Sequence, residues 1–202
     1  MTMNKLGIFV NYWTKKWNVD YRYYIDKLHN LGYDILEFQA QPLLDIDDNE
    51  CRKIKKYADE RGIKLSYSLG LNSRYDVSSP DKEVRAGGVI YLNDIVRKIA
   101  VMEGELFSGV TYAGWGVPSY FIDEKEKEAL FCRSVESMRQ VMKVAEKEGV
   151  TVCCEAVNRF ESPLINTATE AIRYADAVNS PNIGIHLDTY HMNVEENNIG
   201  DA

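Results

Sequence analysis

Short apolar stretches alternate with longer segments of helical period along the whole chain. Most of these short stretches are rich in apolar residues, as in the buried strands of a parallel sheet. Six such strands are predicted, at Gly7–Tyr12, Ile35–Ala40, Lys64–Leu69, Glu105–Thr111, Thr151–Val157 and Ile183–Tyr190. The intervening segments carry apolar residues at every third or fourth position, which predicts amphipathic helices.

Residues with special backbone preferences agree with these boundaries. Ser79 followed by Pro80 predicts a helix N-cap with proline in the first helical position, and Thr167 with Glu170 has capping-box spacing. A glycine lies one to three residues before four of the predicted strands, where it would supply the left-handed conformation that ends a helix. These glycines are Gly32, Gly62, Gly104 and Gly149.

Strict alternation of strand and helix predicts an α/β fold with a parallel sheet. An open doubly wound sheet usually has a glycine-rich turn after its first strand, but here that turn reads NYWTKKWN. Polar residues instead follow the carboxyl ends of several strands, as in a (β/α)8 TIM barrel, which is the preferred prediction. Only about six βα units are present, so we expect residues 1–202 to form a single barrel domain that lacks the last two units.

Composition and charge narrow the classes of partner. The chain is 45% hydrophobic and 27% charged, as in ordinary globular proteins, and its formal net charge is −7. A nucleic-acid partner would require a basic face, so we expect none. The sequence shows neither a secretory leader nor a membrane-spanning stretch. All four cysteines are interpreted as reduced thiols of a cytoplasmic protein, because adjacent Cys153 and Cys154 face opposite sides of a strand.

Two carboxylates at strand ends are the strongest chemical signal. Glu155 lies in the fifth predicted strand and Asp188 in the sixth, so their side chains would meet at one edge of the sheet. Like charges this close require a bound divalent cation or a protonated carboxyl group. Oxygen ligands favour Mn²⁺, Mg²⁺ or Co²⁺. A salt bridge from Glu155 to a lysine or arginine is the less favoured alternative. His186, one layer deeper, is interpreted as a hydrogen-bonded core residue in preference to a ligand.

Aromatic residues accumulate at the same ends of the strands. Phe9 and Tyr12 lie in the first predicted strand, Trp13 and Trp17 follow it, and Trp115 follows the fourth strand. Aromatic faces beside carboxylates suit sugars, although core packing explains any single aromatic equally simply. The glycines that flank Trp115 favour the binding interpretation for that residue.

Several segments resemble a known enzyme family. They are GIFVNYW, LGYDILEF, SSPDKEVR, RSVESMRQVMKVAEKEGV, CCEAVNRFE, LINTATEAI and LDTYHMNVEE. They are similar to the D-tagatose 3-epimerase family, which includes the D-psicose (D-allulose) and L-ribulose 3-epimerases of the xylose isomerase-like barrels. The similarity runs from about residue 5 to the last residue, and its most specific phrases are E-x-x-N-R-F-E and L-D-T-[FY]-H-M-N.

The resemblance implies metal-assisted proton exchange at C3 of a ketose through a cis-enediolate. It makes Glu155 a metal ligand and the acid/base, and Asp188 a second metal ligand, with Mn²⁺ preferred over Co²⁺ or Mg²⁺. It also implies a homodimer or homotetramer. The residues that match substrate-binding positions are Glu161 and His191, at the sugar's O1 and O2, and Phe9, Trp17 and Trp115, along its distal carbons.

Departures from the family pattern limit this expectation. The family's metal histidine, its second catalytic glutamate and a substrate-binding arginine have no counterpart in residues 1–202, so we expect the chain alone to be inactive or impaired. Two alternatives stay open. One is a different barrel chemistry, either a sugar isomerase or a metal-dependent phosphodiesterase, although the latter would need more than the three histidines present. The other is a non-catalytic truncated barrel that binds a sugar or a partner chain.

Overall fold

The computed structural model describes residues 4–118 and 122–202, which form a parallel sheet with helices along one side. In these residues six strands lie in sequence order, and every neighbouring pair is parallel. The strands are β1 (Gly7–Phe9), β2 (Ile35–Gln39), β3 (Lys64–Gly70), β4 (Leu106–Val110), β5 (Thr151–Ala156) and β6 (Ile183–Leu187). The helices are α1 (Tyr21–Leu31), α2 (Asp48–Asp59), α3 (Lys82–Val101), α4 (Glu124–Glu148), α5 (Ala168–Val178) and α6 (Thr189–Glu195).

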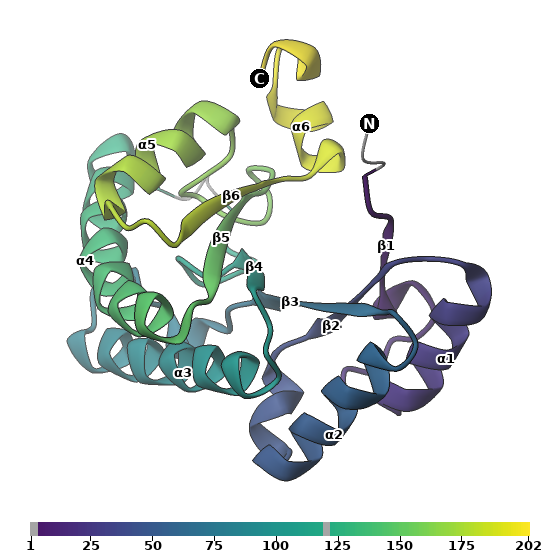
Figure 1. The fold of residues 1–202 in the computed structure, drawn as a ribbon. Helices are drawn as coiled ribbons and strands as arrows, with labels where there is room; N and C mark the ends of the chain where they lie inside the picture. Colours follow the sequence, from purple (N-terminus) through teal and green to yellow (C-terminus); the bar gives the residue numbers. More distant parts are fainter. Residues whose placement is uncertain (1–3, 119–121) are drawn as a thin grey trace.

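The strands form an arc, and α1 to α5 lie outside it (Figure 1). Strands β1 and β6 are the two ends of the sheet, and both termini lie near these ends (Figure 1). The arc is part of a (β/α)8 barrel, as the alternation of elements predicts. No helix in the described part of the chain is long and apolar enough to cross a membrane.

The two faces of each strand explain why the core lies outside the arc. On β2, Leu36 and Phe38 are fully buried under the helices, whereas Glu37 and Gln39 alternate with them and line a cavity inside the arc. On β5, Val152 and Cys154 are buried in the same way, and Glu155 faces inward. Apolar burial therefore anchors the strands from outside and leaves the inward positions for polar side chains.

Helix termini confirm some of the predicted boundaries. Thr167 caps α5 by accepting a hydrogen bond from the backbone N–H of Glu170, as its spacing predicts. Gly32 and Gly149 end α1 and α4 in the left-handed conformation. The acidic run after Asp123 begins α4, with Asp123 as the N-cap.

Other boundaries are wrong. Asp81 caps α3, so Ser79 and Pro80 precede the helix instead of starting it, because the Asp81 carboxylate reaches the free backbone N–H of Glu83. After α3 the positive φ of 50° falls on Glu103, one residue before the predicted Gly104. Gly104 is needed for space, since a Cβ there would lie 2.7 Å from Tyr67 and Ile99.

β2, β4 and β5 are one or two residues shorter than predicted, and β1 and β6 are each three residues shorter. β1 ends at Phe9 because Val10–Tyr12 form a 3-10 turn. β6 ends at Leu187, where Asp188 caps α6. Both predictions extended a strand through apolar and aromatic residues that belong to the following turn or helix, since short apolar runs do not distinguish the two.

Candidate active site

The inward residues line a cavity of about 520 Å³ at the carboxyl ends of the strands. This volume lies within the usual range for small-molecule sites. All seven residues predicted for the site line this cavity: Phe9, Trp17, Trp115, Glu155, Glu161, Asp188 and His191.

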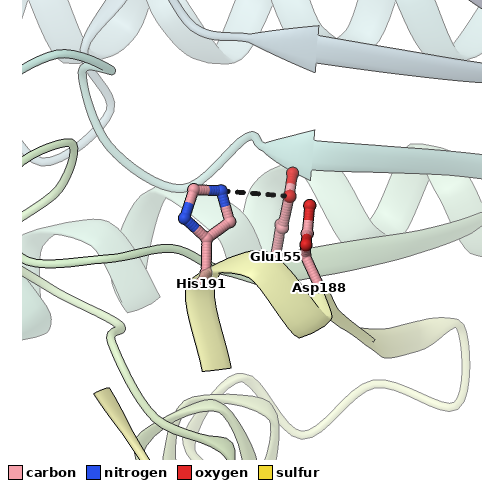
Figure 2. A group of neighbouring side chains, drawn as sticks. All are labelled: Glu155, Asp188 and His191. Carbon is pink, nitrogen blue, oxygen red and sulfur yellow. Dashed lines mark ion pairs between the residues drawn. The ribbon is translucent and has the colours of Figure 1, made fainter. Parts of the chain in front are cut away.

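Glu155 and Asp188 meet where β5 and β6 end. Both side chains point into the same space as that of His191, and one potential ligand atom from each lies within 4.8 Å of the others (Figure 2). Burial raises the pKa of Glu155 to about 7, and the negative charge of Asp188 is the next cause. No lysine or arginine pairs with Glu155 among the described residues, so the salt-bridge alternative is wrong.

Asp188 is positioned by the start of α6. One carboxylate oxygen, Oδ1, accepts a hydrogen bond of 2.7 Å from the backbone N–H of Tyr190. This is an N-cap interaction, and it fixes the side chain while the second oxygen, Oδ2, makes no hydrogen bond within the described residues. A pair of carboxylates with free oxygen atoms is a suitable donor set for a hard divalent cation.

His191 is oriented by hydrogen bonds to its other ring nitrogen. Nδ1 lies 3.1 Å from the backbone N–H of Asn158 and 2.8 Å from that residue's side-chain nitrogen. A backbone N–H can only donate, so Nδ1 is the acceptor and Nε2 carries the proton of the neutral ring. Nε2 faces Glu155 Oε1 at 3.9 Å (Figure 2). In this tautomer Nε2 is a hydrogen-bond donor, which suits a sugar oxygen better than a metal ion.

Glu161 lies in the loop after β5 and is held by two side chains. Its Oε2 accepts a hydrogen bond of 2.8 Å from the Trp115 indole, and its Oε1 lies 3.3 Å from the amide nitrogen of Asn158. Asn158 therefore positions both Glu161 and His191. Asn158 belongs to the E-x-x-N-R-F-E motif, but nothing in its spacing predicts this double role.

Helix α6 is joined firmly to the loop after β5. Arg159 donates to both carboxylate oxygens of Glu195 at 2.6 to 3.0 Å, and Glu196 accepts from the backbone N–H of Ala168 at 2.7 Å. These contacts hold the helix that carries His191 against the strand that carries Glu155.

A second polar layer lies beneath the carboxylates. His186 Nδ1 lies 2.7 Å from the hydroxyl of Ser108 and 3.7 Å from Glu155 Oε2. The hydrogen bond agrees with the interpretation of His186, but its side chain is 38% exposed and lines the cavity, so it is not a core residue. Burial lowers the pKa of His186, although the nearby carboxylate of Asp188 acts to raise it. Nearby, burial raises the pKa of Glu37, whose carboxylate accepts a hydrogen bond from Ser66.

The aromatic residues divide between the cavity and the outer surface. Phe9, Trp17 and Trp115 line the cavity, whereas Tyr12 is 80% exposed outside it. Trp13 packs outside on the ring of Tyr24, with centroids 5.8 Å apart. The aromatic wall expected for the site thus consists of the three residues that the motif comparison selects.

Comparisons with known proteins identify the family of the chain. The sequence pattern of the xylose isomerase-like TIM barrel family matches residues 25–202. A D-psicose 3-epimerase of Ruminiclostridium cellulolyticum is 39% identical over 198 residues, which are 98% of this chain and 67% of that protein. The chain belongs to the D-psicose 3-epimerase family of these barrels.

Members of this family also supply the similar solved structures. The crystal structure of the D-psicose 3-epimerase from Clostridium cellulolyticum with D-tagatose has a TM-score of 0.93, covering 98% of this chain and 68% of that one. A ketose 3-epimerase of Arthrobacter globiformis is 35% identical, covering 96% of this chain and 65% of that protein. The chain spans about two thirds of the length of these relatives.

Proposed function

We propose that the chain carries the metal-binding half of a ketose 3-epimerase site, which exchanges the proton at C3 of a small ketose through a cis-enediolate. The observation that carries the proposal is the pairing of Glu155 and Asp188 in a sugar-sized cavity. It is supported by family membership and by relatives that are named D-psicose and ketose 3-epimerases.

The two carboxylates fit a divalent metal ion, for which we propose Mn²⁺ ahead of Co²⁺ or Mg²⁺. Their oxygen atoms are the hard ligands that such ions prefer, and bringing two negative charges together requires a cation to balance them. When bound, the ion supplies Lewis acidity toward the C2 carbonyl oxygen of the ketose.

Glu155 is the proposed acid/base. A carboxyl group with a pKa of about 7 can both accept and return a proton near neutral pH, which is the property required of a general acid/base catalyst. Glu155 lines the cavity in which the sugar would lie. Inversion at C3 also requires an acid on the opposite face of the sugar, and the second catalytic glutamate of the family has no counterpart in residues 1–202. We therefore propose that the 202-residue chain alone has impaired turnover.

The remaining residues bind the sugar. His191 donates a hydrogen bond from Nε2 to an oxygen at the C1–C2 end, and Glu161 accepts from a neighbouring hydroxyl. Phe9, Trp17 and Trp115 provide flat surfaces for the C–H groups of the distal carbons. The tautomer of His191 and the fixed carboxylate of Glu161 support these roles.

Hydrogen–deuterium exchange at C3 tests the proposal. The chain is incubated with Mn²⁺ and D-fructose or D-psicose in D₂O, and loss of the C3 proton signal is followed by NMR. We expect slow exchange that Glu155→Gln abolishes and that Glu136→Gln, on the exposed face of α4, leaves unchanged. Absence of exchange with both sugars would refute the function. Rapid net conversion of D-fructose to D-psicose would refute the proposed impairment.

The broader setting is proposed on family grounds. We propose that residues 1–202 act as one barrel domain in a cytoplasmic homodimer or homotetramer. Sedimentation of the purified chain measures the oligomeric state directly.

A further inference from the structure

The cavity has a second polar side, away from the metal-binding carboxylates. Strands β2 and β3 and the turn after β1 contribute Asn11, Glu37, Gln39 and Ser68 to its lining. The interior of a TIM barrel is usually filled by bulky branched side chains. Polar side chains at these inward positions therefore require a reason other than packing.

The strand register brings three of these residues together. Gln39 on β2 pairs with Ser68 on β3, and Phe9 on β1 pairs with Glu37. Asn11 lies two residues beyond Phe9, as Gln39 lies two residues beyond Glu37. The register places Gln39 beside Ser68, and Asn11, in the 3-10 turn after β1, lines the same cavity.

Two of these side chains have unsatisfied hydrogen-bonding capacity. The amide oxygens Oδ1 of Asn11 and Oε1 of Gln39 are buried and accept no hydrogen bond within the described residues. The amide nitrogen of Asn11 donates to the carbonyl of Thr14 at 3.1 Å, which fixes the orientation of that amide. Buried carbonyl groups without a partner are uncommon and destabilising, so a ligand donor that reached these two amides would stabilise them.

We propose that Asn11, Gln39 and Ser68 form a polar subsite for the terminal hydroxyl groups of the sugar, which makes the site selective for ketohexoses over analogues without a terminal hydroxyl. This inference rests on the proposed function for the orientation of the sugar. With its C1–C3 end at Glu155 and His191, the distal hydroxyls extend past the aromatic residues toward the first three strands. A site with amide groups placed for a hydroxyl rejects a ligand that lacks it, because the amides are then left unpaired.

The test compares D-fructose with 6-deoxy-D-fructose, which differ only in the terminal hydroxyl. Binding of each sugar is measured in the presence of Mn²⁺ by the fluorescence of Trp17 and Trp115, which line the cavity. We expect the unmodified chain to bind D-fructose roughly tenfold more tightly than the deoxy sugar, the effect of one or two hydrogen bonds. Equal affinities would overturn the inference without any variant.

A thermodynamic cycle then tests whether Gln39 causes the preference for D-fructose. The cycle combines a substitution of Gln39 with the removal of the terminal hydroxyl from the sugar. Gln39→Met preserves side-chain length and removes the amide, and it should reduce the preference for D-fructose to about twofold or less. Gln140→Met, the same change on the exposed face of α4, should preserve the full preference. A preference unchanged by Gln39→Met would overturn the assignment. If that variant does not fold, Asn11→Ser takes its place in the cycle.

The outcome is separable from that of the proposed function, because binding and C3 exchange are measured independently. Selective binding without exchange would preserve the subsite and refute the epimerase function. Exchange at C3 with equal binding of both sugars would refute the subsite alone. If neither sugar binds, both are refuted.

Discussion

The raised pKa of Glu155 makes the metal-free site a source of instability at neutral and alkaline pH. The native state binds the Glu155 proton with a pKa of about 7, against 4.5 for an unperturbed glutamate. A folded-state pKa above the unfolded value contributes stability that is present below pH 4.5 and is lost as the pH rises through 7. At 1.36 kcal/mol per pKa unit, the loss amounts to about 3 kcal/mol by pH 8.

Replacing the carboxylate with a neutral amide should remove this loss. In the presence of EDTA, we expect Glu155→Gln to be more stable than the unmodified chain by about 3 kcal/mol at pH 8 and by about 1 kcal/mol or less at pH 5. For a chain of this size, the difference at pH 8 corresponds to an increase in Tm of roughly 6–12 °C. Urea denaturation and thermal melting at both pH values measure it.

Two further conditions sharpen the test. Glu136→Gln, which changes an exposed glutamate, should show no such pH-dependent difference. Adding Mn²⁺ at pH 8 should reverse the order, because the ion stabilises the ionised carboxylate and the amide binds it poorly. A difference between Glu155→Gln and the unmodified chain that is constant from pH 5 to 8 would refute the reasoning.

Three other measurements probe the same site. Asp188→Asn should weaken Mn²⁺ binding and lower the pKa of Glu155, seen as fewer protons released by Mn²⁺ at pH 7 in calorimetry; an unchanged proton release would contradict it. Trp115→Phe removes the 2.8 Å hydrogen bond to Glu161, and we expect ketose affinity to fall about three- to tenfold; unchanged affinity would show that the bond is unimportant. Mn²⁺ at 100 times its Kd should raise the unfolding free energy by about 2.7 kcal/mol, and no shift in the urea midpoint would argue against an ion site.

Much of the fold follows from the sequence because helices bury the outer face of the sheet. This burial gives the strands and helices recognisable apolar patterns. The alternation of strands and helices, and the inward direction of Glu155, depend on local periodicity and on the pleat of β5. The errors fall where apolar residues continue past a strand end. Val10 is fully buried in a turn, and its burial imitates a longer β1.

The residues that line the cavity could be predicted from the sequence. The contacts among them could not be predicted as well. Glu155, Asp188 and His191 follow from strand ends and motifs, but the tautomer of His191 depends on the backbone N–H of Asn158, which only the folded loop places beside it. The partnerless amides of Asn11 and Gln39 are equally invisible in sequence, since a missing hydrogen bond is a property of the surroundings.

The two oxygen atoms of the Asp188 carboxylate have different roles. Oδ1 starts helix α6, while Oδ2 is available to a cation, so an ion bound through Oδ2 alone leaves the first turn of the helix undisturbed. Asp188 would therefore be able to hold a cation through Oδ2 while Oδ1 keeps the start of α6, and with it His191, in place.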